Sequence, residues 1–182
     1  MNAPIPKQYP VTDAVNEALA VTLRGCEELI PKEDWIKKLA KSEGTGVPLR
    51  IKLGLDPTAP DIHVGHTVVL NKMRQLQNLG HQVIFLIGDF TSLIGDPSGR
   101  NSTRPPLTPE QIKANAETYY RQASLVLDPS KTEIRYNSEW SLPLGAMGMI
   151  QLAAKYTVAR MMERNDFHDR FKAGTPISVH EF

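Results

Sequence analysis

The chain has 182 residues, 41% of them apolar and 23% charged, which suits a globular protein with room for one sizeable core. Its formal net charge of +1 excludes the strong overall basic field that attracts nucleic acid. The single cysteine, Cys26, excludes an intrachain disulfide and a four-cysteine zinc site, and it favours a reducing, cytoplasmic location.

Residues 1–46 are predicted to form a helical N-terminal appendage. Apolar side chains recur at helical spacing across residues 12–29, and Pro31 is typical of the start of a second, short helix. Gly44 and Gly46 are expected to end that helix. No apolar core of a secretion signal stands at the N-terminus.

Residues 47–182 are predicted to form a separate part in which strands and helices alternate. The apolar run Val83–Ile87 is typical of a strand that is covered on both faces. The order strand, helix, strand, helix, strand, helix predicts an α/β fold with a parallel sheet and flanking helices. The expected strands are 50–55, 83–87 and 133–136, and the expected helices are 64–79, 108–127 and most of 143–173.

The last residues resemble the start of a helix. Ser178 and Glu181 have the spacing of a capping box, yet the sequence stops one residue later, which favours a chain truncated from a longer protein. Before them, the uncharged stretch 141–154 is too short and too rich in Gly and Pro to span a bilayer. Core packing is the expected role of its neighbouring methionines, which are Met147, Met149, Met161 and Met162.

The stretch DPTAPDIHVGH (residues 56–66) lies between a predicted strand and a predicted helix. Ligands of parallel sheets bind at the carboxyl ends of strands, and a helix N-terminus there suits phosphate. His63 and His66 are three residues apart and can donate hydrogen bonds to phosphate oxygens, while Gly65 permits close approach. Two alternatives remain open: zinc binding with Asp56 or Asp61 as a further ligand, and simple capping of the helix.

A second stretch, GDFTSLIGDPSGR (residues 88–100), follows the second predicted strand. Its Asp96 can hold an ammonium group, although Asp-Pro-Ser-Gly is also good chemistry for a plain surface turn. Arg100 and Arg104 can close over a polyphosphate, although exposed arginines are common in loops.

Together, GLDPTAPDIHVGH and IGDFTSLIGDPSGR resemble the N-terminal half of the catalytic domain of the tyrosyl-tRNA synthetases, class I aminoacyl-tRNA synthetases with a Rossmann-like fold. The resemblance extends from residue 49 to residue 182, and HVGH stands where the family has its HIGH motif. It implies a tyrosine–tRNA ligase that uses ATP with Mg²⁺, has no tightly bound protein metal, and joins L-tyrosine to tRNA(Tyr). It also implies a cytoplasmic homodimer, with part of residues 143–171 at the subunit interface.

The resemblance assigns residues to both substrates. His63, His66 and Thr58 would contact the ATP phosphates, and Asp56 and Gly65 would line the ATP site. Further roles are implied for five more residues: Asp96, Thr91 and Gly54 at the tyrosine, and Arg100 and Arg104 on a loop that closes on pyrophosphate.

The sequence departs from the family at two points. Lys52 stands where many members have a tyrosine that contacts the phenol of the substrate. The family's KMSKS motif is absent. Lys72-Met73 matches two letters of that motif, but the pair lies inside a predicted helix and is interpreted as a chance match. These residues alone are therefore expected not to complete the reaction. A stand-alone HxGH nucleotidyltransferase and a non-catalytic RNA-binding module remain the alternatives.

Overall fold

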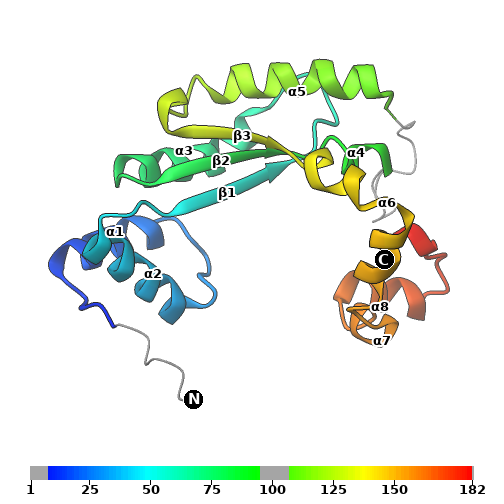
Figure 1. Cartoon of the computed structure of the whole chain (residues 1–182), viewed down its shortest axis with the longest axis horizontal. Helices are drawn as coiled ribbons and strands as arrows, with labels where there is room; N and C mark the ends of the chain where they lie inside the picture. Colours follow the sequence, from blue (N-terminus) through cyan, green and yellow to red (C-terminus); the bar gives the residue numbers. More distant parts are fainter. Residues whose placement is uncertain (1–7, 95–106, 182) are drawn as a thin grey trace. The chain divides into compact units, whose positions relative to one another are not determined.

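The computed structural model describes residues 8–94 and 107–181. Figure 1 labels most of their elements along the chain. The helices and strands are α1 (Asp13–Leu23), α2 (Lys32–Thr45), β1 (Arg50–Leu55), α3 (Val64–Asn78), β2 (Gln82–Ile87), α4 (Thr91–Ile94), α5 (Pro109–Ala123), β3 (Thr132–Tyr136), α6 (Ser138–Ala153), α7 (Val158–Met161) and α8 (Asn165–Lys172), with 3-10 turns at Pro129–Lys131 and Val179–Glu181.

The three strands form one parallel sheet in the order β1-β2-β3 (Figure 1). At the start of β2, Gln82 N donates to Leu49 O over 3.0 Å, and at its end Gly88 N donates to Leu55 O over 2.9 Å. The sequence separation between donor and acceptor is the same in both bonds, so β1 and β2 are parallel, as the alternation of strands and helices predicted. Right-handed crossovers between neighbouring parallel strands place both linking helices, α3 and α5, on one face.

Contacts divide the described chain into two units, each of which is considered by itself. The first contains the described residues up to 53 together with Asp61–Phe85 and Tyr119–Ile134. The second contains Gly54–Pro60, the described part of 86–118, and residues from 135 onward.

In the first unit, α1 and α2 pack around Val15, Leu39 and Ala40, which are almost fully buried. The helix α1 ends at Leu23 instead of at residue 29, because Gly25 adopts a left-handed backbone with φ of 74°. Of the two glycines expected to end α2, only Gly46 does so, with φ of 67°.

Lys72 of α3 holds α1 in place. Its ammonium donates hydrogen bonds to the carbonyl oxygens of Val21, Thr22 and Arg24, at 2.9, 3.0 and 2.7 Å. These carbonyls end α1, where a helix lacks intrahelical donors and has a partial negative charge. Lys72, which together with Met73 matches two letters of the KMSKS motif, therefore caps the C-terminal end of α1.

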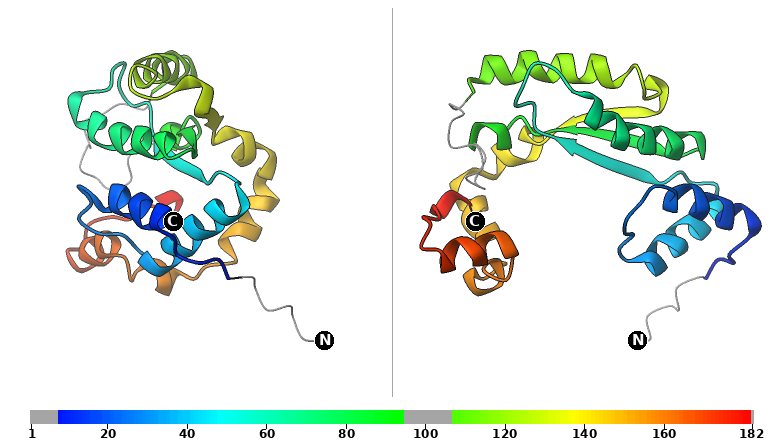
Figure 2. Two further views of the ribbon diagram at one scale, coloured as in Figure 1. Left: turned by 90° about the vertical axis from the view of Figure 1, so that its left-hand side faces the viewer. Right: turned by 180° about the vertical axis from the view of Figure 1, so that it is seen from behind.

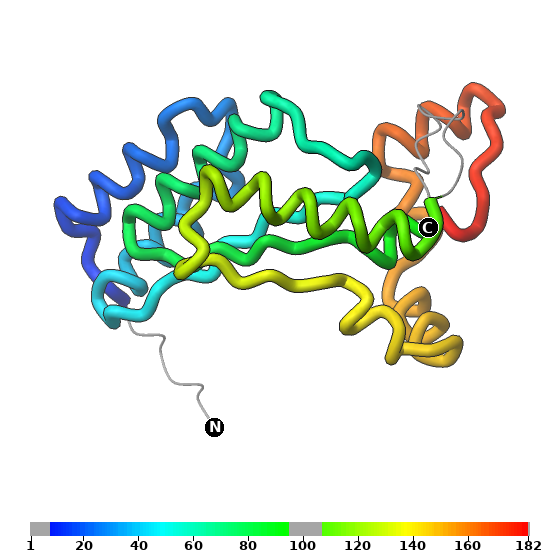
Figure 3. The backbone as a smooth tube through the Cα atoms, turned by 90° about the horizontal axis from the view of Figure 1, so that it is seen from above, coloured from blue at the N-terminus to red at the C-terminus, as the bar shows by residue number. Residues whose placement is uncertain are grey.

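Gln77 of α3 is fully buried and fixes the turn that enters β3. Its Oε1 accepts from Asp128 N over 2.8 Å, and its Nε2 lies 3.1 Å from Asp128 O and 2.9 Å from Thr132 Oγ1. Seen from behind, α3 lies on the near side of the strands (Figure 2). Figure 3 shows α3 and the end of α5 side by side, where His66 and Tyr119 meet edge to face at 6.2 Å.

The second strand is less covered than its apolar sequence predicted. Val83, Phe85 and Ile87 are buried, but Ile84 and Leu86, which point to the other face, are only partly buried. Helices α3 and α5 cover one face, so the prediction of a strand covered on both faces is wrong for the described residues.

In the second unit, α6 begins earlier than predicted and is kinked at Gly145, where φ is 59°. The prediction that the methionines pack in a core is wrong for two of them, because Met147 is 67% and Met149 is 46% exposed. Met161 and Met162 are partly buried. The helix α6 therefore presents an apolar face that no described residue covers.

Replacing Lys72 with methionine should lower the free energy of unfolding by about 1–3 kcal/mol, because the carbonyls that end α1 lose a charged donor. Urea unfolding followed by circular dichroism measures the loss. Lys41→Met on α2 removes an exposed lysine without such bonds and serves as the control. Equal stability of the two variants would contradict this role of Lys72.

Candidate functional site

The N-terminus of α3, in the first unit, is capped by the side chains of two histidines. His63 is the N-cap residue, and its Nδ1 accepts from Gly65 N over 3.1 Å. His66 reaches back, so that its Nδ1 accepts from His63 N over 3.1 Å. The two bonds form a capping box in which imidazoles replace the usual hydroxyl and carboxylate. The rings lie 4.1 Å apart, centre to centre.

This box fixes which nitrogen of each ring has the proton. Each Nδ1 accepts a backbone N–H, so each neutral ring has its proton on Nε2, an assignment made from the hydrogen bonds. Neither Nε2 has a partner among the described residues. Capping and phosphate binding, which the sequence left as alternatives, are compatible because they use different nitrogens.

The side chains around the histidines hold these rings in place. A Cβ on Gly65 would lie 2.9 Å from both Cε1 and Nδ1 of His63, so a larger residue would push that ring aside. Gln122 of α5 accepts from Ile62 N over 2.8 Å and donates to Asp61 Oδ1 over 2.5 Å, which fixes the segment that leads into α3. Asp61 is thereby committed to Gln122.

In the second unit, a chain of hydrogen bonds joins the ends of all three strands. Asn137 Nδ2, after β3, donates to Thr91 Oγ1 over 2.9 Å, and Thr91 Oγ1 donates to Asp56 Oδ1 over 2.8 Å. The Oδ1 of Asn137 accepts from Phe90 N over 2.8 Å. The carboxylate of Asp56 is thus oriented by a hydroxyl, which a buried amide orients in turn.

Gly88 lets this network close. A Cβ at that position would overlap Asp56 Oδ1 and lie 2.6 Å from Thr91 Oγ1. Sequence reasoning noted Gly88 only as part of a tight loop and missed Asn137. The signal for Asn137 was available, because it directly follows the third strand at the same carboxyl edge that drew attention to the other two stretches.

The remaining predicted residues differ in what the structure describes. Thr58 is exposed, and its N–H donates to Asp56 O over 2.8 Å. Gly54 is also exposed, and a Cβ there would meet only Leu86 Cδ2 at an ordinary 3.8 Å. Asp96, Arg100 and Arg104 lie outside the described residues.

A cavity of about 380 Å³ adjoins the Asn137 network in the second unit. It opens between α5 and the start of α6, where Ser138 Oγ donates to Asp89 Oδ2 over 2.6 Å. Burial, followed by the nearby carboxylates of Asp89, Glu117 and Glu139, raises the pKa of the Tyr136 phenol in its wall.

In residues 8–94 and 107–181 no cluster of three His, Cys, Asp or Glu side chains is placed to hold a metal ion.

A family profile described as "tRNA synthetases class I (W and Y)" matches residues 45–182. The chain therefore belongs to the class I tRNA synthetases, in the group that serves tryptophan and tyrosine. Its relatives of high identity in that group are tyrosine enzymes. It is 79% identical over 175 residues to the tyrosine–tRNA ligase of Cupriavidus pinatubonensis, which covers 96% of this chain and 42% of that protein. It is 81% identical over 164 residues to the ligase of Ralstonia nicotianae, covering 90% and 42%.

Solved structures show the same fold. The C-terminally truncated mitochondrial tyrosyl-tRNA synthetase of Aspergillus nidulans superimposes with a TM-score of 0.65 at 20% identity, covering 93% of this chain and 55% of that one. The Archaeoglobus fulgidus enzyme, crystallised with L-tyrosine, gives 0.59 at 25% identity, covering 79% and 41%. The fold is thus the Rossmann-like one, and the chain spans about 42% of the length of its curated relatives.

None of the helices in the described parts of the chain has the length and apolar character needed to cross a lipid bilayer.

Gly88→Ala should destabilise the fold by about 1–3 kcal/mol, because the added methyl group overlaps Asp56 and separates it from Thr91. Gly54→Ala is the matched control, since its methyl group meets only Leu86 at van der Waals distance. Thermal unfolding of the two variants measures the difference. A Gly88→Ala protein as stable as Gly54→Ala would mean that the network is not a tight constraint.

Proposed function

We propose that these residues are part of a tyrosine–tRNA ligase, which activates L-tyrosine with ATP and transfers it to tRNA(Tyr). The observation that supports this most directly is the histidine capping box at the start of α3, which leaves both Nε2–H groups available to phosphate oxygens. Membership of the class I family and the identity of 79–81% to tyrosine–tRNA ligases support the same function.

In this proposal, His63 and His66 donate from Nε2 to the phosphates of ATP, at a helix N-terminus whose dipole favours negative charge. Thr58 contacts a phosphate, Asp56 lines the same substrate's site, and Gly65 keeps the approach to α3 open. Arg100 and Arg104 are proposed to close over the leaving pyrophosphate.

The tyrosine is proposed to be held by its charged groups and its ring. Asp96 receives the α-ammonium, Thr91 lies beside it, and Gly54 leaves room along β1. The bonds of Thr91 to Asp56 and Asn137 support a fixed position for its hydroxyl. Because Lys52 is exposed on β1, it is available to contact the phenol in place of the tyrosine that many family members have.

Activation forms a bond between a carboxylate oxygen of tyrosine and the α-phosphorus of ATP, and it breaks the bond from that phosphorus to pyrophosphate. The residues named above supply no proton and no covalent bond. Their contribution is to align the two substrates and to stabilise the charge that develops on the phosphates. Mg²⁺, bound with ATP as the co-substrate, would neutralise phosphate charge.

The proposal extends to assembly, organisation and location. The apolar face of α6, including Met147 and Met149, supports a homodimer in which a second subunit covers it. The start of the family match at residue 45 supports an appendage over 1–46 and a catalytic part over 47–182. A cytoplasmic location is proposed from the single cysteine and the family.

In the protein made from the complete reading frame, His63→Asn should reduce tyrosine-dependent ATP–pyrophosphate exchange by about 10²–10³-fold. Asparagine caps helices well, so its Oδ1 can replace Nδ1 at the cap, while the Nε2 donor is lost. The melting temperature should therefore change little. The exchange assay and a thermal melt separate the two roles.

His168→Asn, at an exposed position on α8, is the control and should keep full exchange. Exchange in the parent protein that does not depend on tyrosine would favour a stand-alone nucleotidyltransferase. RNA binding without any exchange, unchanged by His63→Asn, would favour the non-catalytic RNA-binding module.

The 182 residues alone are expected to show no tyrosine-dependent exchange, because they contain no KMSKS sequence to hold the phosphates from the opposite side. The loss of several contacts to the transition state, each worth about 3 kcal/mol, lowers the rate by many decades. The same exchange assay, run on this chain at high concentration, measures it. Exchange above background would show that the motif is dispensable.

A further inference from the structure

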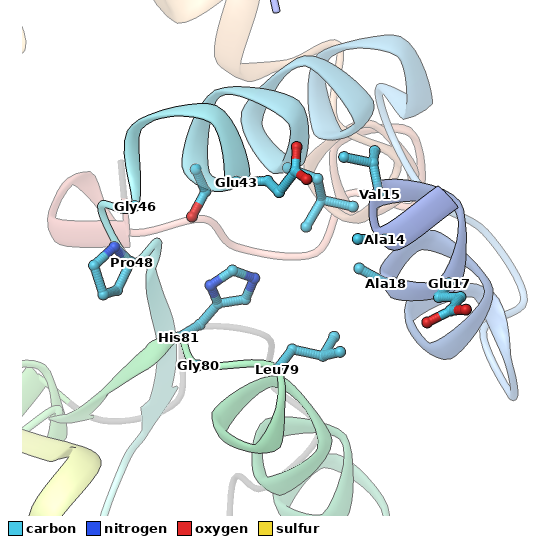
Figure 4. A pocket seen from close by; sticks show the side chains of 12 residues that line it. Ala14, Val15, Glu17, Ala18, Glu43, Gly46, Pro48, Leu79, Gly80 and His81 are labelled. Carbon is cyan, nitrogen blue, oxygen red and sulfur yellow. The ribbon is translucent and has the colours of Figure 1, made fainter. Parts of the chain in front are cut away.

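A second cavity, of about 410 Å³, lies within the first unit and is independent of the proposed ligase function. It is partly open to solvent and is bounded by α1, α2 and the turn that joins α3 to β2. Figure 4 shows the side chains that line it, with the ring of His81 projecting between α2 and Leu79. Its volume falls in the usual range for pockets that bind small molecules.

His81 lines this cavity and has a buried ring nitrogen without a hydrogen-bond partner among the described residues. The residue is only 6% exposed, and its Nδ1 accepts from Leu49 N over 3.3 Å. Burial lowers the pKa of this histidine, so its ring is neutral near pH 7 and has its proton on Nε2. That Nε2 is buried and has no partner among the described residues. A buried donor without an acceptor costs free energy, so a ligand that supplies an acceptor is favoured.

The electrostatics of the cavity favour a cation. The only ionisable side chains in its lining besides His81 are the carboxylates of Glu17 and Glu43. The C-terminal ends of two helices also reach the lining, α2 at Gly46 and α3 at Leu79. Helix C-termini have a partial negative charge, which adds to that of the two carboxylates.

Apart from Ser42, whose hydroxyl donates to Val47 O over 2.6 Å, the remaining side chains of the wall are apolar, which disfavours a bare metal ion as the occupant. Its side chains lack the additional oxygen or nitrogen ligands that a cation needs. They suit a hydrocarbon or aromatic body instead. The apolar members of the lining are Ala14, Val15, Ala18, Leu39, Pro48 and Leu79.

We propose that this cavity is a binding site for a small organic ammonium compound whose apolar body bears a hydrogen-bond acceptor. The ammonium lies at the carboxylate of Glu43, the body packs on the apolar wall, and the acceptor receives the Nε2–H of His81. A bound ligand would therefore give a hydrogen-bond partner to His81 Nε2, which has none among the described residues.

The test uses the 182-residue chain and three related probes in NMR titrations. Methyl 4-(aminomethyl)benzoate has the ammonium, the ring and the acceptor. It should produce saturable shifts at the His81 ring nitrogens and at the amides of Gly46 and Gly80. The probe 4-propylbenzylamine lacks the acceptor and should bind about 2- to 10-fold more weakly. Methyl 4-(hydroxymethyl)benzoate lacks the charge and should bind about 5-fold more weakly.

Two variants assign these differences to residues. His81→Asn keeps an acceptor for Leu49 N but removes Nε2, so the preference for the ester over the propyl compound should disappear. Glu43→Gln, at an exposed position, should reduce the preference for the ammonium over the alcohol, while Glu33→Gln at the other end of α2 should leave it unchanged.

Three results would overturn the proposal. One is the absence of saturable shifts at Gly46 and Gly80 up to the solubility limit of the ester. Another is equal binding of the ammonium and alcohol probes. The third is a preference for the ester that persists in His81→Asn; should that variant not fold, Glu43→Gln still tests the charge.

Discussion

The two hydrogen bonds by which the side chains of His63 and His66 cap the start of α3 are the constraint on which the histidine part of the candidate site depends. A helix that begins at residue 64 needs acceptors for its first N–H groups, and the two Nδ1 atoms provide them. This requirement turns both Nε2 atoms away from the backbone. The orientation of two functional groups therefore follows from the formation of the helix, and it needs no additional partner on the far side of either ring.

Buried polar side chains fix the parts that surround this helix. Gln77 joins α3 to the turn before β3, and Lys72 joins it to the end of α1. Both residues bond mainly to main-chain atoms, and Gln77 Nε2 also donates to the hydroxyl of Thr132. Such bonds specify one arrangement more strictly than apolar packing does, because a displaced main-chain group loses its partner. The helix α3 is in this way tied to both of its neighbours in the first unit.

The sequence was sufficient for the order of the elements and for the region of the site. Periodicity identifies β1, α3 and β2, and the rule that ligands bind at strand ends led to His63 and Asp56. It did not reveal Asn137, because an isolated asparagine after a strand is also ordinary turn chemistry. Nor did it show the bond from Asp56 to Thr91, which depends on how closely β1 and β2 approach at Gly88. Such distances are tertiary properties.

The misjudged elements have physical causes as well. The helix α1 stops early because Gly25 turns left-handed, which a sequence pattern of apolar residues does not register. The methionines of α6 read as core because they are apolar, yet apolar composition does not say which surface covers a residue. For the same reason the burial of β2 on its second face was overestimated.

The backbone origin of the histidine orientation has a consequence for variation. Val64 and Val68, on the first turns of α3, are 83% and 73% exposed and make no contribution to the cap. Substitution there by any residue that tolerates a helix leaves both rings where they are. The exposed positions on the first turns of α3 can therefore vary without moving the histidines, whereas a larger residue at Gly65 would meet the ring of His63 at 2.9 Å and displace it.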